Sequence, residues 1–213
     1  MQTNFSDNSW DDIITACQTN TVPDSWIVGN QKSMNVGGED FLIDIIGKNH
    51  DTYVNGRTAP LTFQFHNVLN GLFRNAFFWP GGDIANFYLP MLKGYFPANV
   101  QKAINPVIKK TYNGNFNGVG SVATELFCLS VREVGEGSGS YLTKDEGTPY
   151  SFYTDDASRK KTTSDGAAVS WMLRTDGNTT DSENYSMYAC LNDGSVDYYG
   201  LSGYLYLAPA FCF

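Results

Sequence analysis

The chain has 213 residues, of which 42% are hydrophobic and 17% charged, and its 13 Tyr, 14 Phe and 4 Trp bring the aromatic share to 15%. A chain of this length can bury a sizeable core, and this composition excludes disorder, coiled coil and collagen. The net charge of −8 would repel a phosphate backbone, so we expect no nucleic acid as a partner.

The sequence predicts neither a membrane helix nor a signal peptide. No apolar run approaches the roughly 18 residues that a membrane helix needs. The stretch from Met1 to Asn8 is polar and has neither the basic nor the apolar region of a signal peptide. We therefore expect no membrane insertion and no secretion signal.

The first part of the chain, residues 9–66, predicts a helix followed by a meander. Ser9 and Asp12 have the spacing of a capping box, and the apolar residues after Ser9 recur at helical intervals. Short strands are then predicted at 26–28, 33–36, 41–46 and 61–65, with Gly37-Gly38 as a two-residue turn. The segment 41–46 is apolar except for Asp44, which indicates a strand covered on both faces.

The middle part, residues 83–112, is predicted to be helical. Asp83 follows two glycines as a candidate N-cap, and Pro90 is expected to kink or end the helix that it starts. A second short helix is predicted at 98–104, where Asn105-Pro106 stops it.

The last part, residues 122–213, reads as β-rich. Strands are predicted at 169–174, 186–191, 195–199 and 205–213, and Asn192-Asp193-Gly194 has the pattern of a hairpin turn. The chain as a whole is predicted to be a single compact α+β domain over residues 1–213, antiparallel and β-rich, with two or three short helices.

Few residues point to catalysis or metal binding. The four cysteines lack zinc-site spacing and lie in apolar runs, so we expect free, buried thiols, no metal and no cofactor. His50-Asp51 is interpreted as a turn, and His66 as a strand-end residue bonded to backbone. The basic runs Lys109-Lys110 and 159–161 are interpreted as solvated faces. An ion near residues 176–181 is left open.

Carboxylates that could act in pairs on a glycan lie in polar, turn-like stretches. We interpret them as solvated charges, since sequence spacing cannot place two of them across one cleft. They are Asp155, Asp156, Asp181 and Glu183.

The C-terminal part is rich in tyrosine beside small polar residues. Tyrosine offers contact area at low entropic cost together with a hydroxyl, which favours a recognition surface. Packing of strand tyrosines in a core explains the same pattern, and both interpretations stay open. The candidate ligand-binding residues are Tyr185, Tyr188, Asn192, Asp193, Tyr198, Tyr199 and Tyr204.

Several motifs, taken in order, resemble the bacterial and phage family known as domain of unknown function 6273. They occur at 9–13, 28–29, 45–51, 61–63, 103–110, 126–134, 171–174 and 208–212. The chain departs from the usual family pattern at Asn30, at 83–86 and at 170–176. The last two motifs are also similar to those of C-type-lectin-like folds, which is an analogy of fold alone.

The resemblance implies a surface or phage-borne protein and no particular reaction. We expect a non-enzymatic virion protein of a phage or prophage, tail-associated, which assembles in the bacterial cytoplasm and binds a host cell-surface molecule. The alternative is a structural subunit, in the head decoration or tail tip, that contacts only other virion proteins; either is expected to be a homo-oligomer in the particle. The expected structural core includes Trp10, Trp171, Arg174, Pro209 and Phe211.

Overall fold

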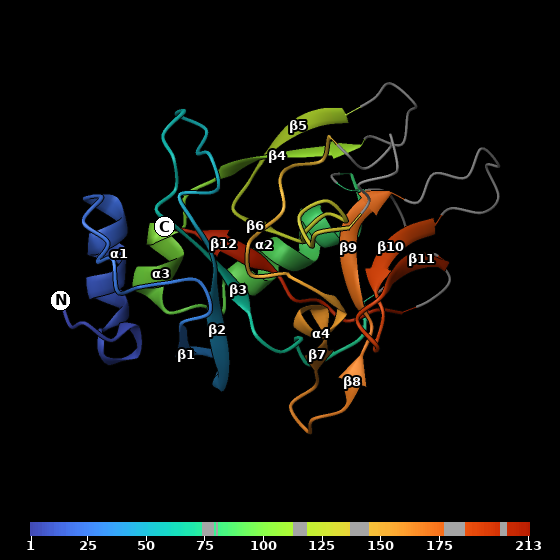
Figure 1. Ribbon diagram of the computed structural model, residues 1–213, viewed down its shortest axis with the longest axis horizontal. Helices are drawn as coiled ribbons and strands as arrows, with labels where there is room; N and C mark the ends of the chain where they lie inside the picture. The colour runs from blue at the N-terminus through green and yellow to red at the C-terminus, as the bar shows by residue number, and fades with distance from the viewer. Residues whose placement is uncertain (74–78, 80, 113–118, 137–144, 177–185, 201–203) are drawn as a thin grey trace.

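The structure is a computed structural model, and it describes residues 1–73, 79, 81–112, 119–136, 145–176, 186–200 and 204–213. Figure 1 shows α1 and α3 together on one side of a central sheet, while strands β9, β10 and β11 lie at the opposite side. The two chain ends both lie on the α1 side. The predicted α+β class is confirmed, with more helices than the two or three expected.

Helix α1 (Trp10–Gln18) forms as its sequence predicts. The Ser9 hydroxyl accepts from the Asp12 N–H at 3.1 Å, and the Asp12 carboxylate accepts from the Ser9 N–H at 3.0 Å. Its buried residues Ile13, Ile14 and Cys17 lie on one face. Trp10 is half-buried, contacts the Phe213 ring, and donates from Nε1 to the Ser33 carbonyl at 3.0 Å.

The main sheet has five antiparallel strands in the order β1-β2-β3-β12-β6. In chain order they are β1 (Gln31–Val36), β2 (Glu39–Lys48), β3 (Leu61–Phe65), β6 (Leu126–Phe127) and β12 (Ala210–Cys212). The predicted hairpin at Gly37-Gly38 joins β1 to β2. The strand predicted at 41–46 is buried on both faces only from Ile43 onward, since Leu42 is exposed.

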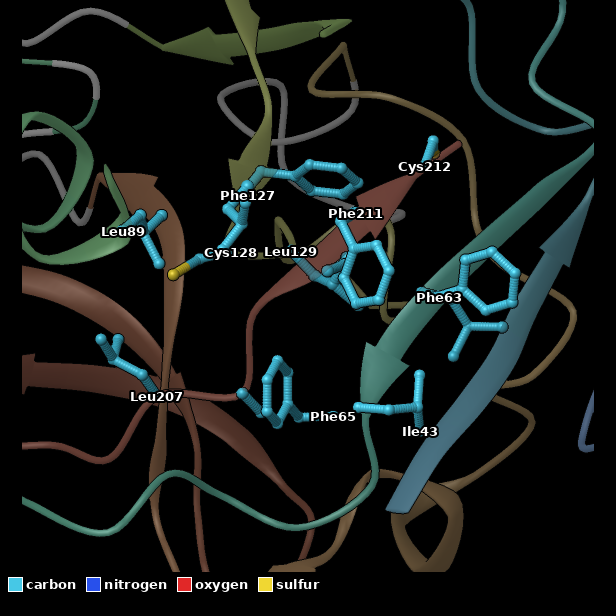
Figure 2. Close-up of a cluster of buried hydrophobic side chains, with 14 of the residues drawn as sticks. Ile43, Phe63, Phe65, Leu89, Phe127, Cys128, Leu129, Leu207, Phe211 and Cys212 are labelled. Carbon is cyan, nitrogen blue, oxygen red and sulfur yellow. The ribbon is translucent and has the colours of Figure 1, made fainter. Parts of the chain in front are cut away.

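The core between these strands is aromatic. Phe63, Phe65 and Phe211 are fully buried and face one another across β3 and β12 in Figure 2. The centroids of Phe63 and Phe211 are 5.5 Å apart. Buried rings of this size each contribute several kcal/mol to folding, so this cluster joins the last strand firmly to the third. Pro209 is also buried, as expected.

The middle of the chain differs from its prediction. A π-helical turn (Ile84–Tyr88, η2) leads into α2 (Leu89–Lys93), and α3 (Ala98–Ala103) follows. Pro90 lies where the π-helical turn changes to α-helix, and the chain is helical on both sides of it, so it does not end the helix. Asp83 is itself helical and makes no side-chain cap bond. Residues 107–112 were wrongly assigned as helical.

These residues form strand β4 (Val107–Tyr112), which pairs with β5 (Val119–Thr124). The physical reason is that Asn105-Pro106 ends α3 and leaves a run with alternating burial to pair as a strand. The strand predicted at 26–28 is also absent. Trp26 instead closes a turn with its N–H on the Pro23 carbonyl, and its side chain is fully buried.

The C-terminal part holds a second, three-stranded sheet in the order β11-β10-β9. Its strands are β9 (Trp171–Asp176), β10 (Ser186–Cys190) and β11 (Val196–Gly200). The predicted turn at 192–194 joins β10 to β11. The remaining elements are a 3₁₀ turn (Phe5–Asp7, η1), α4 (Asp156–Arg159), β7 (Lys161–Thr162) and β8 (Ala168–Val169).

Candidate functional site

The hairpin β10–β11 carries an exposed pair of tyrosines. Tyr188 and Tyr198 are cross-strand partners, so they lie on the same face of the sheet. Their ring centroids are 4.3 Å apart, Tyr198 is 52% exposed and Tyr188 is half-buried. Burial and the hydrogen bond with the Tyr198 hydroxyl raise the pKa of Tyr188. The two rings therefore form one amphipathic platform.

The other predicted residues are spread around this hairpin. Tyr199 follows Tyr198 along the strand, so it points to the opposite face, where it packs against the hydrophobic core beside Met187. Tyr204 is 55% exposed and precedes the segment that leads to β12. Tyr185 lies outside the described residues. The tyrosines are thus divided between exposed positions, such as Tyr198 and Tyr204, and positions packed on the core, such as Tyr199.

Asn192 and Asp193 are exposed at the turn of the hairpin, whereas the tyrosine pair lies nearer the middle of its strands. Asp193 accepts from the Ser195 hydroxyl at 2.7 Å and from the Ser195 N–H at 3.0 Å, and these bonds lower its pKa. The carboxylate of Asp193 therefore stabilises the turn, and Asn192 is the more available of the two.

The closing strand is not a display surface. Ala210, Phe211 and Cys212 of β12 are completely buried between β3 and β6. The sequence analysis assigned Phe211 to the structural core, and its complete burial confirms that prediction. Its neighbours on both sides in the sheet and its apolar side chains place it at the centre of the core.

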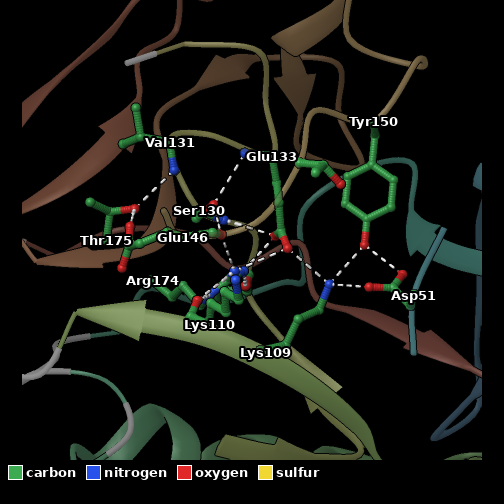
Figure 3. A network of polar contacts seen from close by, with 12 residues as sticks. Asp51, Lys109, Lys110, Ser130, Val131, Glu133, Glu146, Tyr150, Arg174 and Thr175 are labelled. Atoms are coloured by element: carbon green, nitrogen blue, oxygen red, sulfur yellow. Dashed lines mark hydrogen bonds and ion pairs between the residues drawn. The ribbon is translucent and has the colours of Figure 1, made fainter. Parts of the chain in front are cut away.

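A second cluster, which we call the ionic network, lies inside the molecule. It consists of Asp51, Lys109, Glu133, Tyr150 and Arg174, each at most 5% exposed. Figure 3 shows Lys109 between the two carboxylates, with Nζ 2.5 Å from Asp51 Oδ1 and 2.9 Å from Glu133 Oε1. Arg174 holds Glu133 through both oxygens, at 2.5 and 3.0 Å.

The hydroxyls around the network complete its hydrogen bonds. Tyr150 donates to Asp51 Oδ2 at 2.7 Å, and Thr62 donates to the same oxygen at 2.5 Å. Burial by itself raises the pKa of Asp51, but the Lys109 charge and the hydrogen bonds from Lys109 and Thr62 leave it well below its usual range. Burial likewise opposes ionisation of Glu133, whereas Arg174 and Lys109 lower its pKa. Both carboxylates are thus ionised and fully paired.

This arrangement suits a structural role better than a catalytic one. Two cations face two carboxylates, so the five network side chains carry no net charge, and their polar atoms are used by one another. None has the exposure that a substrate would need. The expectation that Arg174 is a paired core residue is confirmed, and Trp171 is fully buried with Nε1 donating to the Arg159 carbonyl at 2.9 Å.

The basic runs were predicted to be solvated, which holds for Lys110 and Lys160 and is wrong for the buried residues Lys109, Arg159 and Lys161. In β4, Lys109 points inward while Lys110 points to solvent, because alternate residues of a strand face opposite sides. Lys161 is also buried and donates to the carbonyls of Phe65 at 2.7 Å and His66 at 3.0 Å. Arg159 is buried and donates to the Gly194 carbonyl at 2.8 Å. No local signal in the sequence could have revealed Arg159 and Lys161, because their partners Gly194 and Phe65 lie far away along the chain.

The histidines lie beside acidic side chains. His66 was predicted to bond backbone, and this is wrong: its Nδ1 is 2.9 Å from Asp44 Oδ2, so the ring bonds a carboxylate. His50 stacks on Tyr150 with centroids 3.9 Å apart, and its Nδ1 is 3.7 Å from Asp51 Oδ2, too far for a hydrogen bond. His50 and Asp51 therefore do not form a catalytic dyad.

Metal-binding and membrane-spanning features were also sought in the described part of the chain. There, no group of three or more His, Cys, Asp or Glu is arranged to hold a metal ion. No helix there has the length and apolar character to cross a membrane. All four cysteines are buried and free of disulfides, as expected. The possible ion site at 176–181 falls almost wholly outside the described residues.

The fold and the sites together define an antiparallel α+β protein with an ionic network in its core and a tyrosine platform on its surface. The family model of the domain of unknown function DUF6273 matches residues 52–213, more than half of the chain. The chain therefore belongs to this family, as its motifs indicated. The motifs at 9–13, 28–29 and 45–51 precede the matched range.

Comparison with curated proteins and with solved structures found no significant match. The C-type-lectin-like fold accordingly stays a prediction. The matched range includes the tyrosine hairpin and every residue of the ionic network except Asp51, which directly precedes it.

Proposed function

We propose that this protein is a non-enzymatic binding domain of a phage or prophage virion, associated with the tail, and that it recognises a host cell-surface molecule. The observation that carries the proposal is the stacked pair Tyr188 and Tyr198, held outward on a two-stranded hairpin. Paired rings that combine apolar faces with hydroxyls are well suited to bind a ligand with both apolar and polar groups.

The surroundings of the platform support this role. The pair belongs to a sheet whose inner face packs on the core, so its geometry is fixed before a ligand arrives, which lowers the entropic cost of binding. Asn192 and Tyr204 add exposed polar groups on neighbouring segments. The ionic network below is closed to solvent and contributes stability to this scaffold instead of chemistry.

A virion structural subunit is the second candidate. It is favoured by apolar side chains that remain more than half exposed, namely Ile27, Val54, Leu72 and Phe87. Neighbouring subunits of a homo-oligomer or other virion proteins would cover such residues.

Binding of the labelled protein to intact cells of candidate host bacteria tests the proposal. We expect saturable binding that Tyr198→Ala weakens at least about tenfold, whereas Tyr198→Phe, which keeps the ring, weakens it less than about threefold. Ile27→Ala serves as the matched control, because Ile27 is 57% exposed and its segment bonds to β2 of the five-stranded sheet, whereas the hairpin belongs to the other sheet. It should leave binding unchanged.

Two outcomes would contradict the adhesin role. In one, the folded protein labels no cells and associates only with purified virion proteins, which favours the structural subunit. In the other, Tyr198→Ala and Ile27→Ala bind cells equally well, which removes the tyrosine platform from the interaction.

A further inference from the structure

An apolar groove of about 280 Å³ lies between the β1–β2 turn and helix α2. The tyrosine pair of the hairpin does not line it, so the groove is a separate site and its role is independent of the function proposed above. Its volume is close to that of the smaller pockets that bind small molecules in proteins.

Aromatic side chains form much of the groove wall. Phe41, Phe73, Tyr88 and Tyr95 all line it, and the rings of Phe73 and Tyr88 meet edge to face at 5.2 Å. Tyr95 is 55% exposed and Met91, also in the lining, 44%. Apolar surface is thus left uncovered at the mouth, and aromatic faces attract both aliphatic groups and cations.

One charge lies in this apolar setting. Glu39 is the single charged side chain among the described residues of the lining, and it is exposed. The Asn70 amide, also in the lining, donates to Glu39 Oε2 at 2.8 Å and so holds the carboxylate at the rim. No lysine or arginine of the described residues forms an ion pair with it. A carboxylate held beside aromatic rings favours a cation and repels an anion.

We propose that this groove binds a small organic cation, namely an alkylammonium group whose charge lies between Glu39 and the aromatic rings and whose aliphatic chain fills the apolar part. The apolar wall selects a ligand with a hydrocarbon portion, and the carboxylate selects its positive charge. A metal ion does not fit, because a lone carboxylate and an amide offer too few oxygen ligands.

Titration with hexyltrimethylammonium, hexanol and hexanoate separates these contributions, because the three probes share one chain and differ in charge. The titration is followed by the NMR chemical shifts of the full chain. The cation should give saturable shifts at residues of the groove. We expect hexanol to bind at least about fivefold more weakly and hexanoate more weakly still. Glu39→Gln should weaken binding of the cation about fivefold and leave hexanol unchanged.

Asp40→Asn is the matched control, since Asp40 neighbours Glu39 on β2, is exposed, and does not line the groove. It should change the affinity for the cation less than about twofold. Tyr95 is exposed, so Tyr95→Ala should leave the core intact. It should weaken binding of the cation about threefold. The proposal is overturned if the cation gives no saturable shifts in the groove, if hexanol binds equally well, or if Glu39→Gln has no larger effect than Asp40→Asn.

Discussion

Lys109 and Lys110 are adjacent in β4 but lie in opposite environments. Lys109 is buried between Asp51 and Glu133, while Lys110 is exposed. Lys109→Met leaves two buried carboxylates with Arg174 as their remaining cation, and breaking a buried ion pair from one side costs about 3 to 5 kcal/mol. Lys110→Met should cost less than about 0.5 kcal/mol. Urea unfolding followed by circular dichroism measures both.

Equal and small losses for the two substitutions would contradict the burial of Lys109. Should Lys109→Met fail to fold at all, Tyr150→Phe gives a milder test. It removes only the hydroxyl that Lys109 and Asp51 share, and it should cost about 1 to 3 kcal/mol.

The residue scale is where the sequence predicted least. The indole of Trp171 and the guanidinium of Arg174 were assigned to the core from their types alone, which succeeded. Lys109 and Lys161 were missed because nothing local distinguishes a buried lysine from a solvated one. Their partners, Asp51 for Lys109 and the Phe65 carbonyl for Lys161, lie 58 and 96 residues away in sequence.

Elements with a clear local sequence pattern were predicted well. Helix α1 has its capping box and an apolar face, and β3 alternates apolar and polar residues with the period of a strand. Strand β4 was missed, because Val107–Tyr112 has an ambiguous period and its pairing with β5 is fixed by the fold. The strand of Tyr198 and Tyr199 was predicted, but its local sequence does not show which of its two faces packs on the core.

The β10–β11 turn packs closely on α4, which gives a test at the level of elements. Gly194 has φ +91°, and a Cβ there would lie 1.8 Å from the Asp156 carbonyl oxygen. Gly38, in the β1–β2 turn, has φ +94° and no atom within 4 Å of such a Cβ. Gly38→Ala should therefore lower the free energy of unfolding only by its backbone strain, about 1 to 2 kcal/mol.

Gly194→Ala should cost about 1 to 3 kcal/mol more, because the turn must move away from α4. Comparison of the two unfolding midpoints in urea isolates the packing contribution. A Gly194→Ala protein as stable as Gly38→Ala would mean that the hairpin does not rest on α4. The tyrosine platform would then lack the support that its fixed geometry requires.

At the scale of the whole molecule, the last strand joins parts of the chain that are distant in sequence. Strand β12 pairs with β3 on one side and with β6 on the other, and Phe213 contacts Trp10 of α1. No local pattern could predict this arrangement, because β12 has only three residues and its neighbours lie more than 80 residues earlier. The core that results encloses all four thiols.

Because of these thiols, we expect the stability of the protein to change with pH in the alkaline range. Burial raises the pKa of Cys17 and Cys128 to about 12, and it raises the pKa of Cys190 and Cys212 as well. A folded-state pKa above the unfolded value contributes stability that is complete below about pH 8.5, where unfolded thiols are protonated, and that is lost as the pH rises toward the folded value.

Lys161 acts in the opposite direction. Burial lowers its pKa to about 8, so its contribution to stability increases between about pH 8 and pH 10.5. One lysine opposes four thiols, each of which can remove up to about 1.4 kcal/mol per pH unit. We therefore expect the free energy of unfolding, measured in urea with reductant present, to fall steadily from pH 8.5 to pH 10.5. Cys17→Ala should make this fall shallower by about a quarter. If the stability of the unsubstituted protein stays constant or rises over this range, the thiols are accessible to solvent in the folded protein.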